Sequence, residues 1–217
     1  MESRIQVSLL NRSGVCSVAS YKAVTGVLTA LQKFLELRMV GGLDSFITSP
    51  QAKILGTKDM QDEPAGNHVG IYLHRISVDP FGRNRYLSSS NGNAARQPEL
   101  PINLHFMLVA WTEHGSNEGT LISWAMQQIG SSLSLDASHL AATDSYWADD
   151  EVIQIQPEEM STEDLLRIWD GLPRPYILSV PLLAKTIRLL PVPEIEAGPA
   201  ITTIATPIGN LNQGAGQ

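Results

Sequence analysis

The sequence predicts an α+β fold in which helices pack on a mixed β-sheet and an extended C-terminal arm follows. Residues 17–38 carry an apolar stripe at helical spacing, and residues 68–78 and 101–111 alternate or run apolar as strands do. Beyond Pro191 the chain is punctuated by proline and nearly uncharged. These patterns predict a folded domain over residues 1–190 and an arm over residues 191–217.

The first predicted element is the helix over residues 17–38. Gly41 and Gly42 follow it, and glycine readily takes the left-handed backbone that ends a helix. Residues 43–66 mix turn formers with a short apolar run and predict a loop with one or two short strands. The apolar side chains of the helix recur every three or four residues: Val24, Val27, Leu28, Leu31, Phe34 and Leu35.

Two strands follow, with a loop over residues 86–98 between them. In the first strand, period two predicts one face formed by Val69, Ile71 and Leu73 and the other by Tyr72, His74 and Ile76. The second strand, residues 101–111, is apolar on both faces in its second half. Such a strand belongs in the middle of a sheet that helices cover.

The second half of the domain contains two further helices and two strands. Ser116 is predicted to cap a helix over residues 117–129, and a short strand follows at residues 152–155. Ser161 and Asp164 have capping-box spacing ahead of a short helix that Gly171 ends. A last strand over residues 176–190 contains Pro181, which removes a ladder donor and predicts a sheet edge or a bulge.

Composition excludes several classes of protein. The 217 residues carry a net charge of −7, which argues against binding duplex nucleic acid, and 43% are hydrophobic, which excludes a wholly disordered chain. The single cysteine, Cys16, excludes an internal disulfide framework. No stretch approaches the roughly 18 apolar residues of a membrane helix, and the run at residues 5–10 is too short for a signal peptide. We therefore expect neither nucleic-acid binding nor membrane insertion.

Charge is distributed unevenly along the chain. Residues 1–100 hold 11 basic and 8 acidic side chains, whereas residues 136–170 hold ten acidic side chains and only Arg167 as a base. One interpretation is a solvated face that maintains solubility. The other is an acidic surface that docks on a positive surface of a neighbouring copy or another partner. Candidate contact residues are Asp149, Asp150 and Glu151, with Arg83 and Arg85 as positive counterparts.

No residue pattern predicts catalysis, a metal or a cofactor. His74 and His105 lie on the two predicted strands and approach each other if these strands pair, but no recognisable spacing supplies further ligands. Cys16 has no base placed near it in sequence, and the segment 115–119 lacks the central serine of a nucleophile elbow. No glycine-rich loop cradles a phosphate. The pair of histidines therefore favours a structural role.

Five segments, taken in order, resemble the tail-terminator (cap) proteins of phage-tail-like contractile injection systems, in the tail-cap N-terminal domain family of virulence-cassette-type particles. The resemblance covers roughly residues 15–190. Two departures are Pro181, where the family usually continues an apolar strand, and the late start of the first helix. The segments are GIYLHRI (70–76), LPINLHFML (100–108), LISWAMQ (121–127), IQIQP with STEDL (153–165) and PYILSV (175–180).

This resemblance implies a phage tail-terminator-like fold and a structural role. It implies a homo-oligomeric ring, six-membered in the family, on the end of the inner tube and the last sheath layer, which ends polymerisation and anchors sheath to tube. The implied partners are further copies of the chain, the sheath protein and the inner tube protein. The implied location is the bacterial cytoplasm during assembly, with release as part of the particle left open. No enzyme activity, metal or nucleotide is implied.

The arm contains an uncharged, β-branched segment that suits pairing with an exposed strand edge. We expect it to pair with a sheath subunit or an adjacent cap subunit, the alternative being a disordered tail. Other functional interpretations are a head-to-tail joining or baseplate accessory protein of a phage-like particle and, third, a small-molecule enzyme. The segment comprises Ala200, Ile201, Thr202, Thr203, Ile204, Ala205 and Thr206.

Overall fold

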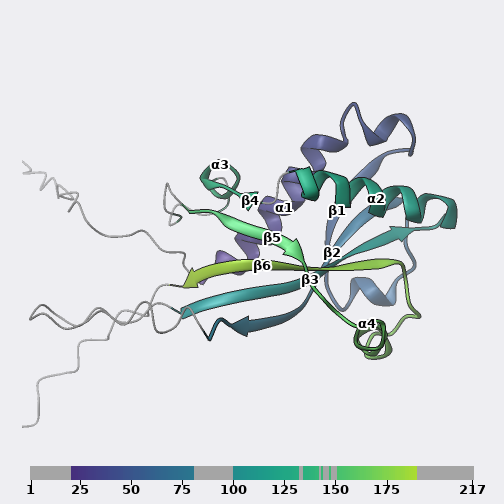
Figure 1. The fold of residues 1–217 in the computed structure, drawn as a ribbon. Helices are drawn as coiled ribbons and strands as arrows, with labels where there is room; N and C mark the ends of the chain where they lie inside the picture. The colour runs from purple at the N-terminus through teal and green to yellow at the C-terminus, as the bar shows by residue number, and fades with distance from the viewer. Residues whose placement is uncertain are drawn as a thin grey trace, which may run out of the picture.

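The computed structural model describes residues 21–80, 100–131, 134–141, 143, 147 and 151–189, and shows a six-stranded sheet with helices on both faces (Figure 1). The α-helices are α1 (Ala23–Met39), α2 (Gly115–Ser131), α3 (Ala137–Leu140) and α4 (Thr162–Asp170), and the 3-10 helices are η1 (Leu43–Ser45) and η2 (Asp59–Gln61). The strands are β1 (Pro50–Leu55), β2 (Asn67–Val78), β3 (Leu100–Thr112), β4 (Ser134–Leu135), β5 (Ile153–Pro157) and β6 (Ser179–Leu189).

The sheet is mixed, as the sequence predicted. Its strand order is β1-β2-β3-β6-β5-β4; β1 pairs with β2 in parallel, and the other neighbours are antiparallel. The third strand, β3, is buried on both faces from Phe106 to Thr112. The prediction that this segment lies inside the sheet is therefore confirmed.

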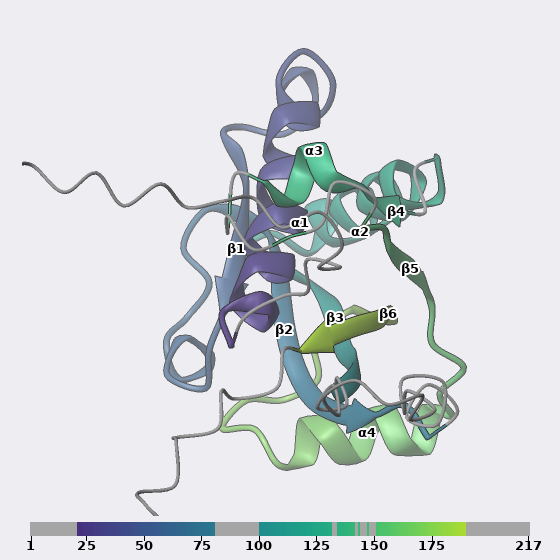
Figure 2. The same cartoon turned by 90° about the vertical axis from the view of Figure 1, so that its left-hand side faces the viewer.

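Two apolar cores form, one on each face of the sheet. On one face α1 and α2 cover side chains that include Ile71, Leu104 and Leu108. On the other face Trp169 of α4 packs with Met107 and Val109. Figure 2 shows α1 and α3 on one side of the strands and α4 on the other. Both faces of β3 are therefore shielded from water, which explains why its sequence does not alternate.

Capping residues and glycines in the sequence indicated where several of the helices begin or end. Ser161 is the N-cap of α4, and its hydroxyl accepts a hydrogen bond from the Asp164 amide, so the capping-box prediction is confirmed. Gly41 has a φ of +78° just after α1, as a left-handed helix end requires. The Ser116 cap is wrong, because α2 already begins at Gly115 and Ser116 lies in its first turn. The two-residue β4 and four-residue α3 are too short to show a period.

A bulge in β2 changes which residues share a face. The register with β3 shifts between Leu73 and Arg75, so Arg75 lies opposite His105 and Ile76 opposite Leu104. Beyond the bulge, Ile76 is on the α1 face rather than on the face of Tyr72, where the strict alternation placed it. An inserted residue reverses the alternation of every residue after it. Arg75 and Ser77 are thereby turned toward His105.

Pro181 lies where the pairing between β6 and β5 ends. It is opposite Met107 of β3, and its carbonyl accepts a hydrogen bond from the Glu158 amide. The N and the carbonyl of one strand residue point to the same side of the strand. The N–H that Pro181 lacks would therefore face β5, at the last hydrogen-bonded position between β5 and β6. The strand begins at Ser179, three residues later than predicted.

Several predicted features fall outside the described residues. These are the loop at 86–98 and the arm at 191–217. The predicted start of the first helix at residue 17 is wrong, because Tyr21 and Lys22 form a turn and α1 begins at Ala23. The domain boundary at residue 190 stays a prediction, with β6 ending at Leu189. Within the described part of the chain, no helix has the length and hydropathy needed to cross a bilayer.

Candidate interaction surfaces and a buried polar cluster

The acidic side chains that the structure describes within residues 136–170 do not lie on one face of the sheet. Its α3 lies on the α1 face of the sheet, β5 lies within the sheet, and α4 covers the opposite face (Figures 1 and 2). Glu163 and Arg167 of α4 form an exposed ion pair. The acidic side chains are therefore divided among three environments.

Asp136 is a structural member of this segment. Its carboxylate accepts hydrogen bonds from the amides of Ser138 and His139 and so caps α3. Hydrogen bonds from the Ser138 hydroxyl and from His139 lower the pKa of Asp136 to about 2. The carboxylate of Asp136 therefore stabilises the N-terminus of α3.

Glu151, one of the predicted contact residues, is buried inside the chain. Its side chain is 4% exposed, and its Oε2 accepts a hydrogen bond from Nη2 of Arg188 at 2.6 Å. This ion pair joins the segment that leads into β5 to the C-terminal end of β6. The other candidates, Asp149, Asp150, Arg83, Arg85 and residues 200–206, lie outside the described residues, so their role as contacts stays a prediction.

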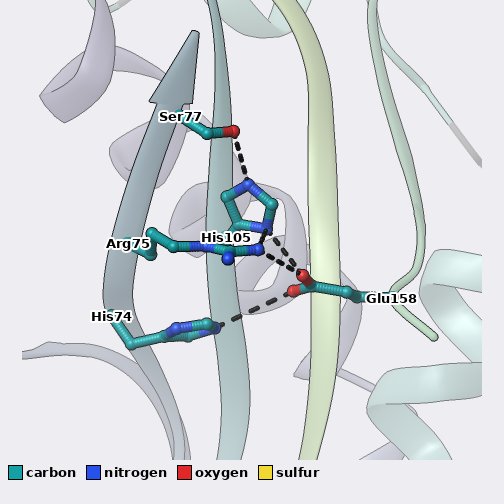
Figure 3. A network of polar contacts seen from close by, with 5 residues as sticks. All are labelled: His74, Arg75, Ser77, His105 and Glu158. Carbon is teal, nitrogen blue, oxygen red and sulfur yellow. Dashed lines mark hydrogen bonds and ion pairs between the residues drawn. The ribbon is translucent and has the colours of Figure 1, made fainter. Parts of the chain in front are cut away.

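Five polar side chains meet on the α4 face, where three strands and the β5–α4 connection come together (Figure 3). We call them the Glu158 cluster: His74, Arg75 and Ser77 of β2, His105 of β3, and Glu158 just after β5. Glu158 Oε1 lies 2.7 Å from His105 Nδ1 and 3.0 Å from Arg75 Nη2. His105 Nε2 lies 2.7 Å from the Ser77 hydroxyl. The prediction that the two histidines approach is confirmed, with ring centroids 6.2 Å apart.

The acceptors and donors of the Glu158 cluster assign its protons. A carboxylate only accepts, so His105 donates from Nδ1 to Glu158, and its Nε2 shares a hydrogen bond with the Ser77 hydroxyl. Arg75 Nη2 also lies 2.9 Å from His105 Nδ1, but Nδ1 carries a proton, so the guanidinium donates to the shared Glu158 oxygen. This assignment satisfies every group of the cluster except His74 Nε2 and Glu158 Oε2.

His74 is the least satisfied member. Its side chain is 7% exposed, and its Nε2 lies 3.9 Å from Glu158 Oε2, too far for a hydrogen bond. Burial lowers the pKa of His74; the Glu158 charge opposes this effect, and His105 and Arg75 add to it. At neutral pH this ring is therefore uncharged.

Ser77, His105 and Glu158 have the connectivity of a Ser-His-carboxylate triad. A triad also requires a substrate pocket beside the serine and donors for an oxyanion. Three hollows in the described part, of about 650, 730 and 810 Å³, are lined by other residues. Across the same described ranges, no group of three or more His, Cys, Asp or Glu is placed to hold a metal ion. What the contacts of this set do in the described structure is join β2, β3 and the β5–α4 connection.

Three exposed apolar side chains close together in sequence, around the end of α1 and η1, were missed by sequence reasoning. Leu37 and Val40 at the end of α1 and Phe46 after η1 are each at least 77% exposed, and we call them the α1–η1 ridge. Val40 lines the 810 Å³ hollow and Phe46 the 730 Å³ hollow. Exposed apolar patches of this kind mark contact sites for other proteins. The short apolar run at Phe46 and Ile47 was the available signal.

One edge of the sheet offers a strand to a partner. β1 is six residues long and lies at the edge, whereas β4 at the opposite edge has only two residues. On β1, the Ala52 carbonyl already accepts a hydrogen bond from Gln32 of α1. Within the described residues, β1 is thus the longer edge for an added strand.

Solved structures with a similar fold come from contractile particles. The anti-feeding prophage cap, a tube terminating cap, is 13% identical with a TM-score of 0.53, over 88% of this chain and 62% of the other. A sheath/tube terminator of an extracellular contractile injection system, PVC, in the extended state, is 14% identical with a TM-score of 0.49, over 89% and 65%. The chain spans less than two thirds of either protein. Its fold is of the tail-terminator type.

The family model for the Pvc16 N-terminal domain matches residues 26–203. The chain belongs to this family. The match includes α1 from Gly26 onward and all six strands, so the folded domain described above is the family domain. No curated protein matches the chain.

Proposed function

We propose that this protein is the cap, or tail terminator, of a contractile injection system, and that it acts without catalysis. It binds the end of the inner tube and the last sheath layer, ends polymerisation and anchors sheath to tube. The observation that carries the proposal is membership of the Pvc16 N-terminal domain family over residues 26–203, on a fold shared with the anti-feeding prophage cap. Assembly in the bacterial cytoplasm belongs to the same proposal.

The described surfaces suit a protein that works through contacts. The α1–η1 ridge and the open edge of β1 both present groups that other chains can cover. The proposed partners are further copies of the chain in a ring of about six, the sheath protein and the tube protein. A closed ring requires two different, complementary surfaces on each copy.

Loss of the cap is expected to alter the particles themselves. In cells lacking the protein, negative-stain images should show tubes of uncontrolled length or sheaths detached from their tubes, and the wild-type chain should restore normal particles. Native mass spectrometry of the purified protein should give a ring of about six copies. Intact sheathed tubes of normal length in the deletion strain would exclude the cap role. A labelled copy found at the baseplate end would indicate a baseplate accessory protein instead.

The arm is expected to hold a neighbour by strand addition. Deletion from Pro193 onward should abolish ring assembly or sheath attachment, because residues 200–206 would no longer pair with a strand edge. Ile201→Pro should have the same effect by removing a backbone donor, whereas Ile201→Val should not. Cosedimentation with sheaths measures both variants. If the truncated and full chains cosediment with sheaths equally well, the arm does not hold a neighbour by strand addition.

The acidic contact is tested at Asp149 and Asp150 alone. Reversing both to lysine should weaken assembly, and so should added salt, which screens exposed charges over about 10 Å at 0.1 M. The matched control replaces both by glutamate. Glu151 is left unchanged because a lysine there would face Arg188 in a buried site. If neither added salt nor the lysine substitutions change assembly, the acidic segment serves only to maintain solubility.

A further inference from the structure

We propose that the Glu158 cluster is a pH-sensitive clip: it fastens the β5–α4 connection to the bulged end of β2 and opens when mild acid protonates His74. The proposal is independent of the cap function. It rests on which elements the cluster joins and on how few other bonds hold them together.

Glu158 reaches over β6 to bind side chains of β3 and β2. Its backbone follows β5, while its carboxylate contacts His105 on β3 and Arg75 on β2, with β6 running between (Figure 3). The side chain is 11% exposed. One carboxylate therefore links the β5–α4 connection to the neighbouring strands β2 and β3 across β6.

Backbone bonding at this point is sparse. Pro157 ends β5 and Pro181 lies beside it on β6, and neither residue has an N–H to donate. The Glu158 amide donates to the Pro181 carbonyl at 3.1 Å, and the capped α4 begins only at Thr162. The side-chain contacts of Glu158 are therefore a large part of what holds the connection.

The cluster holds one carboxylate, and Arg75 is its permanent cation. At neutral pH Glu158 faces the Arg75 guanidinium, the uncharged ring of His74 and the ring of His105. β6 contributes Leu183 opposite His105, and Lys185 is its next residue on that face. On the α4 side, Glu159 and the first-turn Glu163 and Asp164 are exposed; Glu163 bonds Arg167, and Asp164 bonds Ser161. Protonation of His74 would thus add a second cation beside Arg75 without a second buried carboxylate.

The direction of the pH effect follows from His74. Burial holds its pKa below the ordinary value of 6.5 in the closed clip, whereas an opened clip exposes the ring to water. The open form then binds the proton more readily, so acid favours opening. The clip is fully stable above pH 6.5 and loses stability as the pH falls from there toward the lowered pKa. For a ring of pKa 6.5, the open population rises up to about tenfold by pH 5.5.

Hydrogen–deuterium exchange of the full chain at pH 7.5 and 5.5, corrected for intrinsic exchange rates, tests the clip. Peptides covering residues 74–78 and 157–161 should lose up to about tenfold protection at pH 5.5 relative to a peptide within α1. His74→Gln should remove this selective loss, because the amide does not titrate. The matched control is His114→Gln, at an exposed histidine outside the cluster, which should behave as wild type.

Either of two results would overturn the proposal. One is equal loss of protection in α1 and in the two clip peptides, which would mean global destabilisation rather than local opening. The other is an unchanged selective loss in His74→Gln. The wild-type comparison stands on its own if the substituted chain does not fold.

Discussion

Trp169→Ala is expected to lower the free energy of unfolding by about 3–5 kcal/mol, the range for truncating a buried aromatic side chain. Trp169 is the large residue that α4 buries against Met107 and Val109 of β3, and its indole N–H donates to the Ser179 hydroxyl at 3.1 Å. The substitution removes the centre of the smaller core and leaves a buried hydroxyl without its donor. Urea denaturation followed by circular dichroism measures the change.

The matched control for Trp169 lies on the same helix. Leu166 is 43% exposed, so Leu166→Ala removes apolar surface that water already reaches. We expect a change within about 0.5 kcal/mol for this surface substitution. Similar losses in the two variants would mean that α4 is not packed on the sheet in solution.

Arg188→Ala is expected to cost about 3 kcal/mol or more, because it leaves Glu151 buried without its cation. The Glu151 carboxylate is almost fully buried, and the Arg188 side chain is 24% exposed, so water compensates only in part for the lost partner. The free energy of unfolding, measured by urea denaturation at neutral pH, gives the effect. Adding Glu151→Gln to Arg188→Ala should recover part of the loss, because the uncompensated charge disappears.

Arg167→Ala is the control for the ion pair. Arg167 pairs with Glu163 four residues earlier on α4, and both side chains are at least 70% exposed. Such pairs contribute about 0.3–0.5 kcal/mol. Equal effects at Arg167 and Arg188 would contradict the difference in burial between the two pairs.

The elements that could be predicted were those that local chemistry determines. The Ser161 cap depends on residues three apart, and β3 was recognisable because both of its faces are apolar. The bulge in β2 was hidden because it depends on register with β3, which a single strand does not encode. The start of α2 at Gly115 was missed because a serine one residue later looked like a better cap.

The polar sites depended on distant partners and were only partly predictable. His74 and His105 could be placed near each other because neighbouring strands were expected to pair. Glu158, the residue that binds His105, reaches it across β6, and no spacing in the sequence indicates this contact. Glu151 looked like a solvated carboxylate in an acidic run, because its partner Arg188 lies 37 residues further along the chain.

The strand order also determines when the sheet can be completed during synthesis. β1, β2 and β3 are made first, but the partner of the free side of β3 is β6, which ends at Leu189. Until β6 leaves the ribosome, β3, which is buried on both faces in the folded chain, is an open edge, and open edges recruit strands from other chains. A nascent or prematurely terminated chain is therefore expected to be aggregation-prone and to depend on chaperones until its last strand docks.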